Sequence, residues 1–337
     1  MTEQAKTTPQ NTTERRFWQD MDLRAVAPFV ALAALLVFGT LVNSNFIGVD
    51  NLLNIATRSA FIAIIAIGAT FVISSGGLDL SVGSMSAFVA AVTIMFMNSG
   101  IITGILPMLL VAACIAIVVG ALCGLANGVT TTLGRIEPFI VTLGTMGIFR
   151  ALTIYLAEGG SIAMKSQELR AAYRPVYFGN ILGVPVPIVA IIVVALIASF
   201  ILYRTAFGRH IIAVGSNQDV ARYSGIPVNR VRTMAFVIQG ICVAIAILIY
   251  IPRLGAATPT TGLMWELQAI TAVVIGGTAL RGGVGRIWGT VCGALILEVV
   301  GNIMVLSDLV SEYLIGAVQG AIIIIAMLVQ RSLSRRQ

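Results

Sequence analysis

Long apolar stretches dominate the sequence and are separated by short polar segments. A bilayer core is about 30 Å thick, so a helix that crosses it needs about 20 apolar residues. The stretches that meet this pattern are 26–45, 54–75, 82–98, 104–127, 138–157, 184–203, 232–251, 266–280, 287–306 and 310–330. They are continuously apolar, whereas the strands of a membrane barrel alternate apolar and polar residues. The pattern predicts an all-α integral membrane protein, a polytopic bundle of about ten transmembrane helices. The eighth stretch is short and glycine-rich, so a half-helix or re-entrant segment is the alternative there.

Composition and charge support a membrane protein and set its expected orientation. The chain is 58% hydrophobic and 10% charged, against about 25% charged residues in a typical soluble domain. Ten crossings place both termini on one side, and most of the 21 lysines and arginines fall in the tails and loops of that side. Because cytoplasmic loops are enriched in basic residues, we expect both termini in the cytoplasm. Residues 1–25 and 331–337 are then cytoplasmic tails that flank a transmembrane domain over 26–330. The net charge of +7 is a topology signal and requires no nucleic-acid partner.

The sequence lacks the residues that several kinds of chemistry require. The first 25 residues contain no apolar run typical of a cleaved signal peptide. One histidine and four dispersed cysteines do not have metal-ligand spacing. Neither lysine follows a glycine, so the Gly-Lys pair of a phosphate-binding loop is absent. We therefore expect no catalytic residue, no metal and no cofactor. Asp79, Glu266 and Glu298 near span ends keep an ion-coupled carrier open as an alternative.

The segment "FVISSGGLDLSVGSM" (71–85) interrupts the apolar pattern between the second and third spans. Irregular backbone at membrane depth is tolerated only where protein or a water-filled cavity surrounds it. We interpret the segment as a helix junction or hinge, with the Asp79 carboxylate capping a helix start. Lining of a solute path and proton coupling remain alternatives for Asp79. The junction residues are Gly76, Gly77, Asp79, Ser81 and Gly83.

The polar segment 204–232 lies between the sixth and seventh spans, and within it "NQDVARYSGI" is typical of a short amphipathic helix. Asn217 is suited to cap its start, Asp219 lies in the first turn, and Gly225 suits its C-terminal stop. Such a capped helix is the form expected of a docking element, and an ordinary solvated loop helix is the alternative. The residues expected to contact a partner are Asn217, Gln218, Asp219, Ala221, Arg222 and Gly225.

Four ordered motifs carry a resemblance to a known family. They are "SSGGLDLSVGSM", "GRIEPFIVTLGTMGIFRAL", "FGRHIIAVGSNQDVARYSGIPVNRVR" and "VIGGTALRGGVGRIWGT". Together they resemble the permease subunits of bacterial ATP-binding-cassette importers for sugars, of the ribose, xylose and galactofuranose type, over about residues 45–330. The resemblance implies that 204–232 is the coupling loop, whose degenerate Glu-Ala-Ala-x-x-x-Gly motif reads here as Asp219, Val220, Ala221 and Gly225. The Asp and Val leave open which ATPase subunit matches.

The resemblance also implies the surroundings of the chain. It implies a homodimer in the lipid of the bacterial inner membrane, two ATPase subunits beneath it, and a periplasmic sugar-binding protein above it. The external segment 158–183, with Lys165, Glu168, Arg170 and Arg174, is then a landing surface for the binding protein, or else a plain solvated loop. A same-superfamily permease for an autoinducer sugar or a branched-chain amino acid is the alternative. The sugar itself is not specified by the sequence.

Polar residues within the spans are candidates for contact with a sugar, whose hydroxyls need donors and acceptors but no fixed charge. Interhelical hydrogen bonds are the competing role for each. The candidates are Thr70, Asn127, Thr142, Thr145, Gln239 and Asn302.

A weak internal repeat relates two parts of the chain. "IGATFVISSGGLDLSVG" (67–83) and "IGGTALRGGVG" (275–285) share the order I-G-x-T, a glycine pair and a closing glycine, at unequal spacing. Repeats of this kind place a solute path at their interface in many transporters.

Overall fold

The structure is a computed structural model that describes residues 23–307, 316–317 and 320–321. The predicted tenth span (310–330), the C-terminal tail and most of the N-terminal tail lie outside the described residues, so those predictions are not tested.

Helices account for most of the described chain and strands for only a few residues, and the predicted all-α membrane fold is confirmed. Seven helices are long and apolar enough to cross a membrane, and two apolar helices are shorter. Each of the first nine predicted spans coincides with one of these helices, because continuous apolar runs without internal breaks favour a single helix. The nine helices are α2 (Leu23–Val42), α3 (Val49–Ser74), α4 (Val82–Asn98), α5 (Ile105–Leu133), α6 (Pro138–Leu156), α9 (Val186–Arg204), α12 (Val228–Leu254), α13 (Trp265–Ile275) and α14 (Ile287–Ser307). A 3-10 turn, η1 (Ser44–Ile47), joins α2 to α3.

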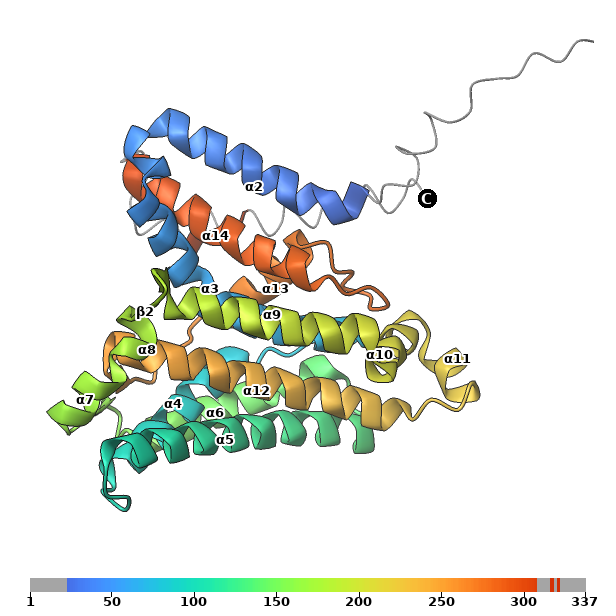
Figure 1. The fold of residues 1–337 in the computed structure, drawn as a ribbon. Coiled ribbons are helices and arrows are strands. Elements are labelled where there is room, and N and C mark those ends of the chain that lie inside the picture. The colour runs from blue at the N-terminus through green and yellow to red at the C-terminus, as the bar shows by residue number, and fades with distance from the viewer. Residues whose placement is uncertain (1–22, 308–315, 318–319, 322–337) are drawn as a thin grey trace, which may run out of the picture.

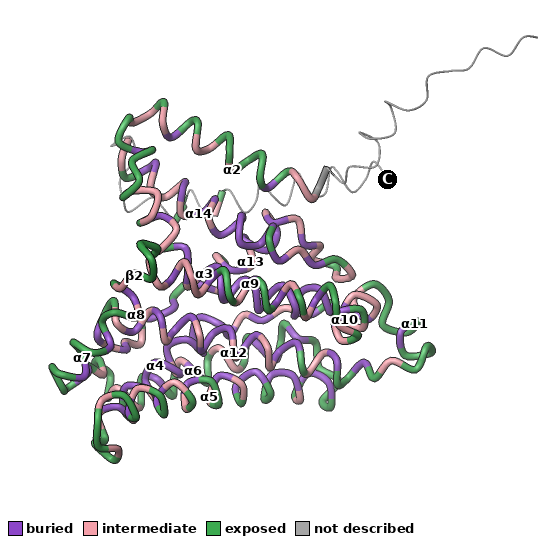
Figure 2. Tube along the Cα trace, in the orientation of Figure 1, coloured by how far each residue is buried: buried purple, intermediate pink, exposed green. Residues whose placement is uncertain are grey.

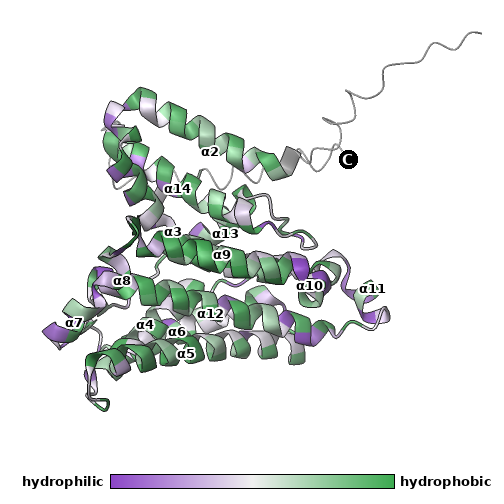
Figure 3. Cartoon of the chain, viewed as in Figure 1, coloured by the Kyte–Doolittle hydropathy of each residue, from purple (hydrophilic) through white to green (hydrophobic). Residues whose placement is uncertain are grey.

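Helix α3 forms the centre of the bundle and packs against α12, α14, α9 and α13 (Figure 1). In the apolar 18-residue stretch of α3, 83% of the residues are buried. The corresponding share is 22% for α5 and 11% for α2. Figures 2 and 3 show that the outer helices α2 and α5 present apolar, exposed surfaces. In a membrane protein such apolar surfaces face lipid, which explains their exposure in an isolated chain.

Small residues bring α5 and α12 into backbone contact. A Cβ atom at Gly124 would lie 2.1 Å from the Phe236 carbonyl oxygen, and one at Gly240 would lie 1.9 Å from the Gly120 carbonyl oxygen. Glycine is therefore required at these positions, as is common where membrane helices pack closely. This pair of helices supports the end of the bundle where the candidate site lies.

The eighth predicted span is a half-helix. α13 has 11 residues and is therefore about 16 Å long, roughly half the hydrocarbon thickness. Gly276 packs against Gly289, and Gly293 packs against Ala272, so α13 and α14 run antiparallel. The irregular segment 255–264 leads into α13. The sequence left a half-helix or a re-entrant segment as alternatives to a full span, and the structure has the half-helix.

The two ends of the bundle carry different short elements (Figure 1). One end has α7 (Gln167–Tyr173), α8 (Pro175–Phe178) and two small antiparallel sheets, β1 (Ile162–Ala163) with β4 (Ala256–Ala257) and β2 (Asn180–Ile181) with β3 (Val184–Pro185). The other end has α10 (Ala206–Ser216) and α11 (Gln218–Tyr223). Helix α2 begins at the same end as α10 and α11.

Candidate functional site

Two consecutive capped helices form the segment 204–232, whereas the sequence predicted only the second. Thr205 caps α10 by accepting a hydrogen bond from the Gly208 amide at 3.2 Å. Asn217 caps α11 by accepting from the amides of Asp219 and Val220 at 3.1 and 3.0 Å. The second cap follows the predicted geometry. α10 was missed, although the hydroxyl of Thr205 in front of an apolar run was an available signal.

Helix α11 ends as the sequence predicted, at Gly225. This residue has φ +78°, which glycine adopts at little cost. The Ile226 amide donates to the Ala221 carbonyl at 3.1 Å and the Gly225 amide donates to the Arg222 carbonyl at 3.0 Å. These two bonds form a Schellman motif. The helix direction is therefore set by the backbone as well as by packing.

One face of α11 is held by the bundle and the other is free in the described chain. Ala221 is buried, whereas Val220 is 60% exposed and Tyr223 is 92% exposed. Asp219 and Arg222 are also exposed. An aromatic side chain left this exposed at the end of a membrane bundle is the type of residue that dominates protein interfaces.

Gly215, near the end of α10, touches both glycine-rich segments of the internal repeat. A Cβ atom there would lie 1.8 Å from the Ser74 carbonyl oxygen and 2.5 Å from the Gly283 amide nitrogen. The Gly283 amide in turn donates to the Ser74 carbonyl at 3.0 Å. We call these three residues the glycine joint. It links the helices α10 and α11 to the end of α3 and to the segment before α14, and the sequence did not predict it.

The predicted junction between α3 and α4 is an irregular segment in which Asp79 and Ser81 are buried and Gly76 is exposed. Gly76 follows the end of α3 with φ +80°. The Asp79 Oδ1 atom accepts hydrogen bonds from the Ser81 amide at 2.8 Å and the Ser81 hydroxyl at 2.6 Å. Ser81 is the residue before the first residue of α4. The carboxylate thus bonds the N-cap residue itself, whereas the predicted cap would bond an amide of the first helical turn.

Two glycines of this junction allow close packing. A Cβ atom at Gly83 would lie 2.1 Å from the Gly262 carbonyl oxygen and 2.4 Å from Glu266 Oε2, and one at Gly77 would lie 3.1 Å from Val72 Cγ1. The irregular segment before α13 therefore contacts the start of α4. The two interrupted regions of the chain meet inside the bundle, where surrounding protein satisfies the requirement for irregular backbone.

Each of the six candidate path residues makes a hydrogen bond within the chain, although Asn127 Oδ1 and Gln239 Oε1 have no partner in the described part of the chain. Thr70, Asn127, Thr142 and Gln239 are fully buried, and Thr145 and Asn302 are partly exposed. Their partners are Thr290 for Thr70 (2.9 Å), Ser81 for Asn127 (2.8 Å), the Pro138 carbonyl for Thr142 (2.9 Å), the Thr142 carbonyl for Thr145 (3.3 Å), the Ile65 carbonyl for Gln239 (3.3 Å) and Asn51 for Asn302 (3.0 Å). In this conformation the buried four act in helix packing.

Arg150 is a charged residue in the middle of α6, and the structure explains its place. Its Nη1 atom donates to the carbonyl oxygens of Pro259 and Thr261. Those carbonyls belong to the irregular segment before α13, a series of turns in which the amides of Thr261 and Leu263 donate to the carbonyls of Thr258 and Thr260. Charged side chains at membrane depth are found where they bond backbone carbonyls or each other. Arg150 thus supports the half-helix, a role that the sequence did not indicate.

The segment 158–183 is an ordered cap on the opposite end of the bundle. Tyr173 is buried, and its hydroxyl donates to the Leu248 carbonyl at 2.6 Å. Burial raises the pKa of this hydroxyl. Arg170 donates to the Met164 carbonyl at 2.6 Å, and Arg174 lies over the Phe178 ring at 5.0 Å. Lys165 and Glu168 are exposed, so the segment presents charges on a fixed scaffold.

Comparisons with known proteins agree with this architecture. A family model described as "Branched-chain amino acid transport system / permease component" matches residues 51–327. The ribose import permease protein of Bacillus subtilis is 38% identical over 335 residues, which cover 98% of this chain and 99% of the relative. The ribose import permease protein of Haemophilus influenzae is 38% identical over 309 residues, covering 92% and 94%. The xylose transport system permease protein of Escherichia coli is 31% identical, with 94% of each chain covered. With a multi-pass helical bundle and a family match over most of its length, the chain belongs to this family of transport-system permease components.

Proposed function

We propose that the chain is the membrane-spanning subunit of an ATP-binding-cassette importer that carries a monosaccharide across the bacterial inner membrane. The relatives named as ribose and xylose permeases match nearly their whole length. The buried polar residues of the helices are mostly uncharged amides and hydroxyls, which suit a neutral solute. The chain contains no Gly-Lys pair, so a separate subunit supplies ATP hydrolysis and this subunit is not an enzyme.

The single observation that carries the proposal is the pairing of an exposed docking helix with the glycine joint. Residues 217–225 present Val220 and Tyr223 outward, while Gly215 contacts Ser74 and Gly283 inside the bundle. A force applied to α11 by an ATPase subunit is therefore delivered to the junction between α3 and α4 and to the segment before α14. Both are irregular segments between helices, where rearrangement breaks few helical hydrogen bonds.

The remaining partners follow from the same orientation. We place α10, α11 and both termini in the cytoplasm, and the segment 158–183 outside as the landing surface of a periplasmic sugar-binding protein. Two permease copies form a homodimer around the path. Thr145 and Asn302 are the candidates that the first steps of opening would expose, because the other four are buried in helix contacts.

Replacement of Tyr223 by alanine tests the docking role. The side chain is 92% exposed, so its removal leaves the fold of the permease intact, whereas loss of an interface aromatic typically costs about 2 kcal/mol or more of binding. We expect co-purification of the ATPase to fall about tenfold or more. Tyr155→Ala is the matched control, because Tyr155 is 79% exposed on α6, distant from α11. Equal ATPase retention in Tyr223→Ala and wild type would show that α11 is only a connector.

Energy coupling is tested separately in cells. Uptake of the sugar should continue when the proton gradient is collapsed and ATP is maintained. Loss of uptake under these conditions would favour an ion-coupled carrier instead.

A further inference from the structure

A basic cleft of about 770 Å³ lies where α11 meets the ends of α5, α6 and α12. Four arginines line it, Arg135, Arg222, Arg230 and Arg232, together with one carboxylate, Glu137. The arginines come from three separate parts of the chain: the connection between α5 and α6, the helix α11, and the start of α12. Their gathering at one place is thus a product of the fold.

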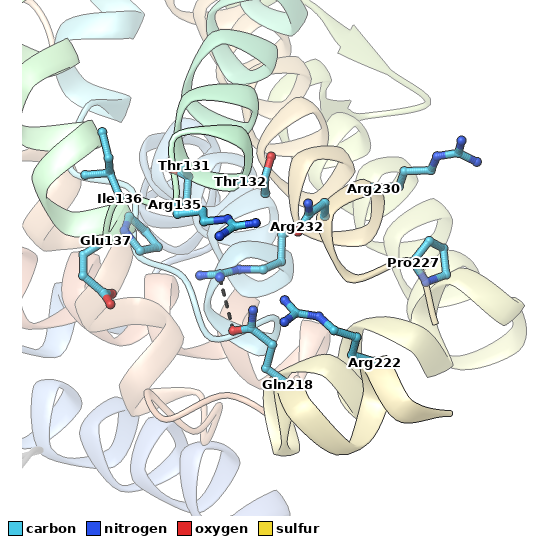
Figure 4. Close-up of a pocket in the computed structure, with 12 residues that line it drawn as sticks. Thr131, Thr132, Arg135, Ile136, Glu137, Gln218, Arg222, Pro227, Arg230 and Arg232 are labelled. Atoms are coloured by element: carbon cyan, nitrogen blue, oxygen red, sulfur yellow. Dashed lines mark hydrogen bonds between the residues drawn. The ribbon is translucent and has the colours of Figure 1, made fainter. Parts of the chain in front are cut away.

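Three of the four guanidinium groups converge. Figure 4 shows Arg135, Arg222 and Arg232 pointing toward one another across the cleft, whereas Arg230 points away from it. Arg232 Nη1 reaches Gln218 Oε1 at 3.5 Å. The Nε atom of Arg232 is buried and has no hydrogen-bond partner within the described part of the chain. Three cations held this close, with one carboxylate nearby, repel one another unless an anion lies between them.

Two long helices also begin at this cleft. α6 starts at Pro138, which has no amide hydrogen, and α12 starts at Val228, whose amide donates to the Ile226 carbonyl at 2.8 Å; neither helix has a side-chain cap. Free amides and the positive end of the helix dipole favour an anion. The positive dipole ends of α6 and α12 therefore add to the charge of the converging arginines.

The geometry favours phosphate over carboxylate. Planar guanidinium groups bind both anions in a bidentate manner, but a planar carboxylate has two oxygens to share among three forks. A tetrahedral phosphate presents oxygens in several directions. We propose that this cleft binds a phosphate-bearing ligand, which is the phosphoryl group of a soluble small molecule or of a lipid headgroup at the membrane surface.

Binding here would connect α11 to the bundle. Arg222 and Gln218 lie on α11. Arg135 lies between α5 and α6, and Arg232 lies in the first turns of α12. A bound phosphate would therefore restrain the exposed helix against the membrane domain. The binding itself does not depend on the proposed transport cycle, because it concerns the permease alone.

The test uses the whole permease in nanodiscs of phosphatidylcholine, with inorganic phosphate as the probe and ³¹P NMR line broadening as the readout. Loss of one charge-assisted contact weakens binding about tenfold. We expect that change for Arg135→Gln and for Arg232→Gln. Arg230→Gln is the matched control: it removes the same charge from the same region and should bind phosphate within about twofold of wild type. Acetate should bind more weakly than phosphate.

The lipid arm adds phosphatidic acid to the nanodiscs. Displacement of inorganic phosphate by this lipid would identify a headgroup site, and unchanged phosphate binding would identify a soluble ligand; both support the proposal. Absence of phosphate binding, equal weakening in all three arginine variants, or equal affinity for acetate would overturn it. So would variants that bind phosphate like wild type but lose the ATPase subunit, because the cleft would then be a protein-docking surface.

Discussion

One methyl group added at Gly215 should break the link between α10 and the interior of the bundle. In Gly215→Ala the new Cβ would lie 1.8 Å from the Ser74 carbonyl oxygen. A normal contact is about 3.5 Å, so the two segments must separate by roughly 1.7 Å. The Gly283 amide, bonded to that same carbonyl at 3.0 Å, cannot keep both its position and its bond.

The magnitude follows from two contributions. Overpacking of a tight contact costs about 1–3 kcal/mol, and loss of the Gly283–Ser74 hydrogen bond costs about 0.5–1.5 kcal/mol. The arrangement in which the three residues of the glycine joint are in contact is thus destabilised by about 2–4 kcal/mol, which lowers its population about tenfold or more. Because the damage is confined to one contact, the nine described apolar helices should still insert and pack.

The assay compares three quantities on the reconstituted importer: sugar uptake, ATP hydrolysis with the binding protein present, and ATP hydrolysis without it. Gly215→Ala should lose uptake and lose the stimulation by the binding protein, while it retains the ATPase subunit on α11. Gly144→Ala is the control, because no atom lies within 4 Å of a Cβ built at this helical position. Wild-type uptake and stimulation in Gly215→Ala would refute the claim that the glycine joint transmits motion.

Three further predictions concern stability and topology. Arg150→Met removes the donor to the Pro259 and Thr261 carbonyls and should lower the free energy of unfolding by about 2–3 kcal/mol. The melting temperature should fall, and Arg150→Lys should restore part of it. Equal melting temperatures of wild type and Arg150→Met would contradict the claim that Arg150 supports the half-helix. Tyr173→Phe leaves the Leu248 carbonyl unpaired and should cost about 1 kcal/mol without weakening attachment of the ATPase; a loss of ATPase attachment would place the segment 158–183 on the wrong side. In a chain with its four native cysteines replaced, a cysteine at Ser216 should react only with cytoplasmic reagent and one at Ser166 only with external reagent. Labelling of Ser216→Cys from outside would reverse the orientation.

The helical spans were predictable because their signal is local. A run of apolar residues long enough for the membrane specifies a helix without reference to the rest of the chain, and α4 begins and ends where its pattern predicted, at Val82 and Asn98. The caps of α11 were equally local: Asn217 and Gly225 act on amides and carbonyls within a few residues of themselves. Such features depend on spacing along the chain alone.

The predictions for polar residues were harder to make, since the partner of a polar group is not written in its own neighbourhood. Thr70 bonds Thr290 and Gln239 bonds the Ile65 carbonyl, so candidates for a solute path are helix contacts in this conformation. Asp79 bonds Ser81, the N-cap residue of α4, and not an amide of the first turn, and only the fold shows that Asn127 completes this cluster. Periodicity identifies a buried polar residue and leaves its partner unspecified.

By itself, the sequence determined the membrane class of this protein, nine of its helical segments and the short capped helix α11, because each depends on residues close together in the chain. Only the tertiary structure decided which groups Gly215, Arg150 and the arginines of the basic cleft lie against. Gly215 acts through Ser74 and Gly283, and Arg150 acts through Pro259 and Thr261. Contacts between residues this far apart in the sequence arise from the packing of whole helices, and no local pattern encodes them.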